Sequence, residues 1–258
     1  MELFNAGHID NQQSRMWLMS DIHIGCRNWA KKIFLQDVEE IKKDPHARVE
    51  INGHTLQKDL RTSVGDVYGQ PIRPGDQKYV AVETLKPIVD KLIGISGGNH
   101  DEGSRIKEDS TDIKDLCRFL GVHYFKDEIC FRISIGQDKY GNPNVKSFYG
   151  VHGTSNAGTI GAIMNSLFRL SNVCDADVYF MGHTHWTGQF PNGFFRRDII
   201  HGKMIPVARL FVSSASYQGR ERYPVVNALT PKTIGAPIVT IDSDKNKLSV
   251  ECPMEMFA

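Results

Sequence analysis

Aspartate, asparagine and histidine residues gather in five short stretches of this sequence, each directly after an apolar run. The stretches read DIH at 21–23, NGH at 52–54, GNHD at 98–101, VHG at 151–153 and GHTH at 182–185. Carboxylate, imidazole and amide groups together suit borderline divalent metals. One such stretch is weak evidence, because a lone histidine pair is more often solvated or packed in a core. Five in series, mostly beside glycine, predict a shared metal site.

Strands must deliver these stretches to one place. Short apolar runs at 16–20, 49–52, 93–96, 145–151 and 178–181 each lead straight into one of them. In α/β sheets, ligands gather beyond the carboxyl ends of the strands. The five polar clusters are therefore expected to meet at one edge of the fold.

The spacing of apolar residues predicts helices between several of these strands. Helices are expected over 29–43, over 77–92 with a kink at Pro87, from an N-cap at 110–111 to Gly121, and over 158–170. Further strands are expected at 129–135, 205–213, 237–241 and 247–252. Strands that alternate with helices and then dominate the second half predict an α/β layered sandwich. Without an internal repeat or a linker, residues 1–258 are expected to form a single domain.

Composition describes an ordinary soluble globular protein. The chain has 258 residues, 40% of them hydrophobic and 24% charged, with a formal net charge of +1. The near-neutral charge argues against a protein that clamps DNA by electrostatics alone. Five scattered cysteines favour a reducing compartment over a disulfide framework. With no signal segment and no apolar run long enough to span a bilayer, we expect a cytoplasmic protein without a membrane partner.

In order and spacing, the five stretches resemble the calcineurin-like metallophosphoesterases. The pattern of that superfamily runs DxH, GDxxD, GNH followed by an acidic residue, a lone histidine, and GHxH. Here it stands as DIH, GHTLQ, GNHD, VHG and GHTH, across about two-thirds of the chain. The DIHIG form of the first motif is similar to the double-strand-break-repair exonucleases, and small phosphoesterases of phages and bacteria are similar too. The resemblance implies a four-layer αββα sandwich of two mixed sheets.

The resemblance also implies a site for two divalent metals, with Mn²⁺ expected first and Fe, Zn, Ni or Mg as alternatives. The first and last stretches would supply one metal, and the third, fourth and last the other. A residue after the second strand would bridge the two. The implied metal-site positions are Asp21, His23, His54, Asn99, His152, His183 and His185. Two metals about 3.5–4 Å apart can hold both the attacking water and a phosphoryl oxygen.

Three more residues receive roles beside the metals. The resemblance makes His100 the general acid or transition-state stabiliser, and Asp101 the partner that orients it. A histidine suits this task because its ordinary pKa lies close to neutral pH. Arg105 follows the same motif closely and is expected near the substrate phosphate. The histidines outside the motifs are expected to be solvated or packed: His8, His46, His123 and His201.

The second stretch departs from the superfamily pattern. His54 occupies the position where a bridging aspartate is expected, and Gln57 stands where many members have another aspartate. Neutral imidazole has one free lone pair and cannot bridge two cations without losing a second proton. We therefore expect single or weak metal occupancy and a large loss of activity. His54 is either a natural variant or an inactivating replacement, and the intact remainder of the site favours replacement. Glu50 is expected to face solvent at an exposed strand edge.

The leading functional hypothesis is a metal-dependent phosphoesterase. Phosphodiesters of nucleotides or nucleic acid are preferred because of DIHIG and of basic and aromatic residues after GHTH, among them Phe190, Phe194, Phe195, Arg196 and Arg197. Phosphomonoesters or phosphoproteins are the nearest alternatives. A catalytically silent binding module is favoured by His54, and a hydrolase of non-phosphate esters is a weaker third reading. Resemblance to the repair nucleases implies a homo-oligomer.

Overall fold

Two six-stranded mixed sheets form the centre of the protein. The computed structural model describes residues 2–58, 69–98, 111–137, 140–153, 159–219 and 232–256. The first sheet has the order β13-β12-β2-β3-β4-β5. Its strands are β13 (Lys247–Glu251), β12 (Ile238–Asp242), β2 (Gln13–Ser20), β3 (Ala47–Asn52), β4 (Leu92–Ser96) and β5 (His123–Phe125). Strands β2 to β5 run parallel, whereas β12 is antiparallel to both neighbours.

The second sheet has the order β1-β6-β7-β8-β10-β9. Its strands are β1 (Phe4–Ile9), β6 (Glu128–Gln137), β7 (Pro143–Val151), β8 (Val178–Met181), β10 (Lys203–Ser213) and β9 (Gly188–Asp198). Strands β7, β8 and β10 run parallel, and β9 returns antiparallel along β10. A small pair, β11 (Thr233–Ile234) with β14 (Glu255–Met256), lies apart from both sheets in pairing.

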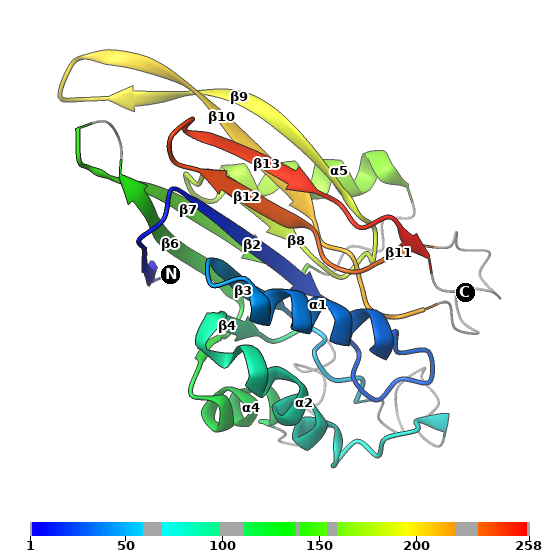
Figure 1. Ribbon diagram of the computed structural model, residues 1–258. Coiled ribbons are helices and arrows are strands. Elements are labelled where there is room, and N and C mark those ends of the chain that lie inside the picture. The colour runs from blue at the N-terminus through cyan, green and yellow to red at the C-terminus, as the bar shows by residue number, and fades with distance from the viewer. Residues whose placement is uncertain are drawn as a thin grey trace.

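Helices cover the outer faces and complete four layers. α1 (Lys31–Lys43), α2 (Gln77–Leu85), the 3-10 helix η2 (Lys86–Lys91) and α4 (Asp112–Leu120) lie on the side of the first sheet, as Figure 1 shows. α5 (Ile160–Phe168) and η3 (Arg169–Asn172) lie on the side of the second sheet. The expected αββα sandwich of two mixed sheets is confirmed.

Alternation along the strands separates two apolar cores. In β2, Trp17 and Met19 pack under the helices, while Met16 and Leu18 belong to the core between the sheets. Successive strand residues point to opposite faces, so a fully buried strand needs apolar residues on both. Burying a large aliphatic or aromatic side chain contributes roughly 1.5–3 kcal/mol. These two cores hold the strand ends in fixed positions.

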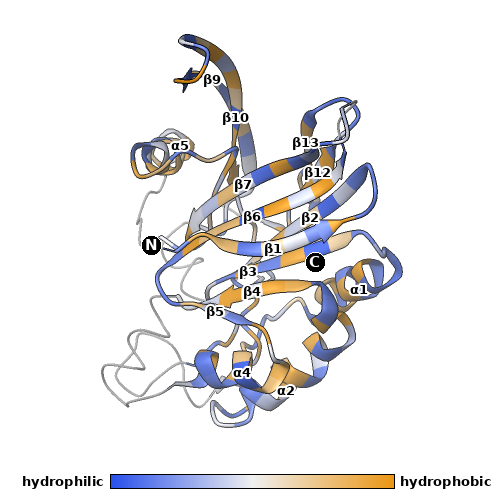
Figure 2. Cartoon of the chain, turned by 90° about the vertical axis from the view of Figure 1, so that its left-hand side faces the viewer, coloured by the Kyte–Doolittle hydropathy of each residue, from blue (hydrophilic) through white to orange (hydrophobic). Residues whose placement is uncertain are grey.

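Several expected elements differ from the observed ones in informative ways. The helix expected at 77–92 ends at Leu85 and continues as η2, where Ile88 leaves helical geometry beside Pro87. Strands β1 and β9 were not expected. Figure 2 shows β9 and β10 extending as a long hairpin beyond the rest of the sheets. No helix within the described ranges is long and apolar enough to cross a membrane.

Glu50 corrects another expectation. It lies in β3, between β2 and β4 in the middle of the sheet, and its side chain is fully buried. Alternation places it on the face opposite Val49 and Ile51, toward the second sheet. The strand is not an exposed edge, because β2 and β4 pair with both of its sides.

Candidate metal centre

The polar stretches meet where the parallel strands of both sheets end. Asp21 follows β2, His54 follows β3, His152 follows β7 and His183 follows β8. The two sheets are joined here by hydrogen bonds. The Asn52 side-chain amide donates to the Val151 carbonyl at 2.9 Å, and the His183 backbone N–H donates to Asp21 Oδ2 at 2.9 Å. Four of the five stretches therefore converge at one edge as expected, whereas residues 99–101 of the third lie outside the described residues.

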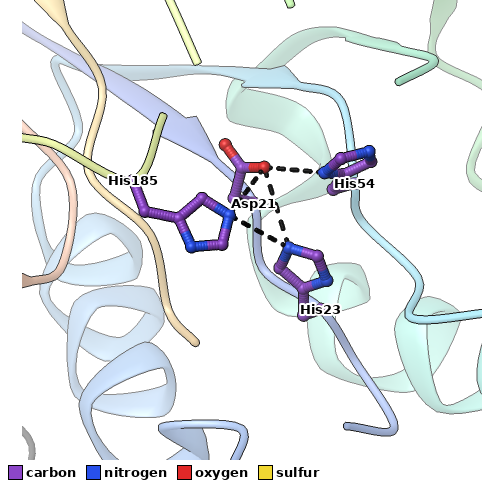
Figure 3. A group of neighbouring side chains, drawn as sticks. All are labelled: Asp21, His23, His54 and His185. Carbon is purple, nitrogen blue, oxygen red and sulfur yellow. Dashed lines mark hydrogen bonds and ion pairs between the residues drawn. The ribbon is translucent and has the colours of Figure 1, made fainter. Parts of the chain in front are cut away.

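One carboxylate oxygen lies at the centre of the cluster. Asp21 Oδ1 is 2.8 Å from His54 Nδ1 and 3.3 Å from His185 Nε2. His23 Nε2 lies 3.7 Å from the same oxygen and 3.4 Å from His185 Nε2. Figure 3 shows these four side chains pointing toward one another. His152 Nε2 approaches Asp21 Oδ1 from the second sheet at 3.8 Å.

The ionised form of Asp21 is favoured despite complete burial. Burial alone would raise its pKa, but the imidazoles of His152 and His185 outweigh burial and hold the pKa well below its usual range. Asp21 Oδ2 accepts hydrogen bonds from the His183 backbone and from the Ser20 hydroxyl. With Oδ2 engaged in this way, Oδ1 is the oxygen that faces the imidazole nitrogens.

Hydrogen bonds behind the imidazoles orient their inner nitrogens. His152 Nδ1 lies 2.9 Å from the Asn52 carbonyl and must donate its hydrogen there. Its Nε2 therefore carries the lone pair, and this buried atom has no hydrogen-bond partner in the part of the chain that the structure describes. His23 Nδ1 lies 2.8 Å from Gln57 Oε1, which directs His23 Nε2 inward. Such outer partners fix the tautomer of a metal-binding histidine.

The buried imidazoles favour their neutral form. Burial lowers the pKa of His54 well below its usual value, and the neighbouring His152 adds to this, although Asp21 opposes it. Burial also lowers the pKa of His152, again against the effect of Asp21. A metal needs a neutral imidazole, because the protonated ring has no lone pair to offer. His54 Nδ1 then donates its hydrogen to the ionised Asp21 Oδ1 at 2.8 Å, so a metal bound at this nitrogen would take the place of that proton.

The backbone of the cluster is held in a rarely populated conformation. Five of its residues have positive φ angles between 43° and 67°: Asp21, His23, His54, His183 and His185. A non-glycine residue in this region costs of order 1–3 kcal/mol, and such residues collect at functional sites. Two glycines allow the stretches to approach closely. A Cβ on Gly53 would lie 2.2 Å from the His152 ring, and one on Gly98 would lie 2.5 Å from the His54 ring.

The structure brings together six of the predicted site residues. Their possible ligand atoms form two groups in which all atoms lie within 4.8 Å of one another, with His54 shared. The first group contains Asp21, His23, His54 and His185, and the second contains His54, His152 and His183. Asn99, His100, Asp101 and Arg105 lie outside the described residues. Their roles remain predictions.

Gln57 has a role that the sequence did not reveal. From the sequence it is only a missing carboxylate, whereas in the fold it is buried and contacts the His23 ring. Its position three residues after His54 was the available signal. The residues after GHTH also differ from expectation. Arg196 pairs with Asp175 and Asp177, while Phe190 and Phe194 pack near Phe211 on the side of α5.

The donor set fits a divalent metal. Three imidazoles and a carboxylate form the first group, and a buried lone pair on His152 faces the same region. Borderline ions such as Zn²⁺, Fe²⁺ and Ni²⁺ are bound by such nitrogen-rich sets. Asp21, His23, His54 and His185 are the residues best placed to hold one ion.

Comparisons with known proteins find likeness in fold but none in sequence. No protein-family model matches the chain, and no curated protein matches its sequence. The solved structures to which it is similar include a predicted phosphoesterase from Streptococcus pneumoniae, with 13% identity and a TM-score of 0.42 over 93% of this chain and 88% of the other. A metallophosphoesterase from Sphaerobacter thermophilus has 14% identity and a TM-score of 0.42, covering 93% and 89%. Vps29 from Entamoeba histolytica, complexed with Zn²⁺, has 12% identity and a TM-score of 0.41, covering 95% and 99%.

These likenesses concern the fold alone. The layers, the mixed sheets and the strand-end motifs agree with one another in this protein. Identities of 12–14% with TM-scores of 0.41–0.42 say nothing of a substrate. Function therefore has to be argued from the site residues.

Proposed function

We propose that this chain is a divalent-metal-dependent hydrolase of phosphate esters whose turnover is limited by His54. The observation that supports this most strongly is the Asp21 carboxylate, with four imidazole nitrogens from two sheets within 3.8 Å of one of its oxygens. A surface ion pair would need neither this burial nor this convergence. The positive φ angles at the same residues support a functional rather than a purely structural cluster.

A bound divalent metal would polarise a phosphoryl oxygen and lower the pKa of water, which is the chemistry that phosphoester hydrolysis needs. The protein's own part is to hold the ligands rigidly and to supply a proton. Asp21 keeps its negative charge, and burial keeps His54 and His152 neutral. In the proposal His100 donates a proton to the departing oxygen, Asp101 orients it, and Arg105 contacts the phosphate. With His54 in the bridging position, single or weak metal occupancy replaces, in this proposal, the two Mn²⁺ ions that the superfamily pattern implies.

The substrate class is proposed on narrower grounds. Phosphodiesters, either nucleotides or nucleic acid, remain preferred because the first motif reads DIHIG. Three of the basic and aromatic residues after GHTH do not support this preference, since Arg196 is engaged by two aspartates and Phe190 and Phe194 are packed. Phosphomonoesters, including phosphoproteins, are the alternative within the same chemistry.

The test compares the unaltered chain, which carries His54, with the variant His54→Asp. Each protein is assayed with bis(p-nitrophenyl) phosphate and p-nitrophenyl phosphate in Mn²⁺, with and without a chelator. We expect His54→Asp to raise hydrolysis at least 100-fold, because an aspartate can bridge two cations and adds a negative charge. His8→Asp is the matched control, because it makes the same exchange at an exposed histidine that belongs to neither ligand group.

The relative rates on the two substrates decide between phosphodiester and phosphomonoester hydrolysis. Activity that is lost with the chelator and gained only by His54→Asp supports the proposal. If neither substrate nor a carboxylate ester is hydrolysed by His54→Asp while its fold is intact, the proposal is wrong. Hydrolysis of the carboxylate ester alone would instead identify a non-phosphate esterase.

His54 itself favours a second function, a metallophosphoesterase-fold binding module without catalysis. The bridging position carries an imidazole that contacts Asp21 at 2.8 Å, so the cluster is intact without a second carboxylate. In this case metal binding would persist in the natural chain, whereas hydrolysis would be absent even in His54→Asp.

A further inference from the structure

The exchange of a carboxylate for an imidazole at position 54 changes which metal centre the cluster can form. We infer that Asp21, His23, His54 and His185 form a closed site for a single Zn²⁺-like ion, in place of an open centre for two metals. This inference depends on the metal-binding part of the proposed function but not on hydrolysis.

The spacing of the four ligand atoms matches one tetrahedral ion. With Zn–N and Zn–O distances of about 2.0–2.1 Å, the ligand atoms around a tetrahedral zinc lie about 3.3 Å apart. In the first group, His54 Nδ1 lies 2.8 Å from Asp21 Oδ1, and His185 Nε2 lies 3.3 Å from the same oxygen. His23 Nε2 lies 3.4 Å from His185 Nε2 and 3.7 Å from Asp21 Oδ1. These four separations lie within about 0.5 Å of the tetrahedral distance. The remaining two, from the His54 ligand atom to those of His23 and His185, lie within 4.8 Å.

The chemistry of the donors selects the kind of ion. Three imidazole nitrogens and one carboxylate oxygen suit Zn²⁺ or Co²⁺, whereas Mg²⁺ and Mn²⁺ prefer oxygen-rich sets. An aspartate at position 54 would have moved the balance toward oxygen. His54 therefore favours zinc over the manganese expected from the sequence.

A second ion would lack both a bridge and a counter-charge. The second group consists of His54, His152 and His183, and it shares the His54 ring with the first. If His54 Nδ1 binds the first ion, its other nitrogen can reach a second ion only after the ring loses another proton. Among the residues placed in the structure, neither group contains a carboxylate other than Asp21. Within the described part of the site, two dications would then share one negative charge.

Closure of the site has a functional consequence. Structural zinc sites have four protein ligands, whereas catalytic ones have three and leave the fourth position to water. The first group supplies four protein ligands, so a bound ion would have no position left for water or substrate. The chain with His54 would hold its metal firmly and remain inactive for that reason, rather than because the metal is lost.

The experiment measures metal content in the full-length chain. The protein is stripped with a chelator, dialysed against Zn²⁺ and analysed by inductively coupled plasma mass spectrometry, and the Co²⁺ form is examined by visible absorption. We expect one zinc per chain and an intense four-coordinate Co²⁺ spectrum that does not change between pH 6 and 9. In His54→Asp we expect two metals per chain and a weaker spectrum that depends on pH.

A variant of the second group separates the alternatives. His152→Ala should leave zinc content at one per chain in the natural background but reduce it from two to one in the His54→Asp background. Circular dichroism checks that each variant is folded. His54→Ala should still bind zinc, at least 10-fold more weakly, because it keeps three of the four ligands.

Several outcomes would overturn the inference. Two zinc ions per natural chain would mean that His54 bridges as an imidazolate, and no bound zinc would mean that the four side chains do not form a site. A Co²⁺ spectrum that titrates with pH would show a water ligand and hence an open site. One zinc in the natural chain together with an inactive two-metal His54→Asp protein would support the inference while contradicting the proposed function.

Discussion

Glu50 is the most unusual single residue outside the metal cluster. Its side chain is fully buried in the middle of the first sheet, and neither carboxyl oxygen has a hydrogen-bond partner among the residues that the structure places. Burial raises the pKa of this carboxyl well above its usual value. A buried polar group without a partner costs about 1–3 kcal/mol. The neutral acid is therefore the form present in the fold, and it weakens the sheet.

Replacing Glu50 should stabilise the protein, and more so at high pH. The folded state keeps a proton that the unfolded state loses above about pH 4.5, so stability falls as pH rises from that value toward the raised folded pKa. We expect Glu50→Met to raise the free energy of unfolding at pH 8 by about 1–3 kcal/mol. Urea denaturation at several pH values measures this.

Glu50→Gln isolates the effect of ionisation. It keeps an unpaired polar group of the same shape but cannot lose a proton. Its stability should equal that of the natural chain near pH 4 and exceed it at pH 8. A difference between the two proteins that does not depend on pH would contradict the assignment of a raised pKa to Glu50.

Gln57 acts through the ring of His23. Its Oε1 lies 2.8 Å from His23 Nδ1, so it holds the ring with Nε2 toward the cluster. Loss of such a partner typically weakens metal affinity 10- to 100-fold. We expect this loss in Gln57→Leu and a much smaller one in Gln57→Glu, which keeps an acceptor. Competition with a chromogenic chelator measures the affinity, and equal losses in both variants would show a packing effect instead.

At the scale of elements, glycines allow the chain segments after neighbouring strands to lie close enough to bring the cluster residues together. Gly98 follows β4 by two residues, and a Cβ there would lie 2.5 Å from His54 Cδ2 and 2.9 Å from the His54 backbone nitrogen. We expect Gly98→Ala to displace His54 and to lower both metal content and thermal stability. The backbone contact is decisive, because a side chain alone could rotate away.

Gly161→Ala is the matched control for this prediction. Gly161 lies in α5, and a Cβ there would contact nothing within 4 Å. Alanine in a helix is more stable than glycine by roughly 0.5–1 kcal/mol, so this variant should melt at the same or a higher temperature. Metal content should not change. If Gly98→Ala behaved in the same way, the close approach to His54 would be unimportant.

Helices with a clear apolar stripe could be predicted from the sequence, whereas strand β9 could not. The stripe of α1 buries Phe34, Val38 and Ile41 as its spacing indicates. β9 reads GQFPNGFFRRD, whose proline and two glycines are typical of a loop. It forms a strand because all eleven of its residues pair with β10, and this pairing partner follows only after the turn at 199–202. Tertiary pairing outweighed local propensity there.

The site was predictable in type but not in its details. Strand-end motifs indicated that Asp21, His54 and His183 would meet, since parallel strands end at a common edge. The contact between Gln57 and His23 depends on the path of the chain after His54, which no periodicity encodes. The burial of the Glu50 side chain depends on which strands flank β3, and that is a property of the sheet order rather than of the local sequence.

At the scale of the whole molecule, the hairpin of β9 and β10 extends an apolar tip away from both cores (Figure 2). Ile199 and Ile200 in its turn are 86% and 90% exposed. Because neither side chain is buried, we expect the double variant Ile199→Ser with Ile200→Ser to change the free energy of unfolding by less than about 0.5 kcal/mol. Chemical denaturation measures this. A larger loss would mean that the tip is covered in solution, for instance by a second copy, which light scattering would show.

The ligands of the cluster come from both sheets, and this has a consequence for the folding of the chain. His23 and His185 are 162 positions apart in sequence, yet their Nε2 atoms lie 3.4 Å from each other. An ion held between them would act as a removable cross-link, restricting the unfolded chain much as a disulfide does across a long loop. Binding free energy of this kind adds directly to folding free energy. A chelator would remove the ion and thereby break this cross-link between the sheets, while every covalent bond stays in place.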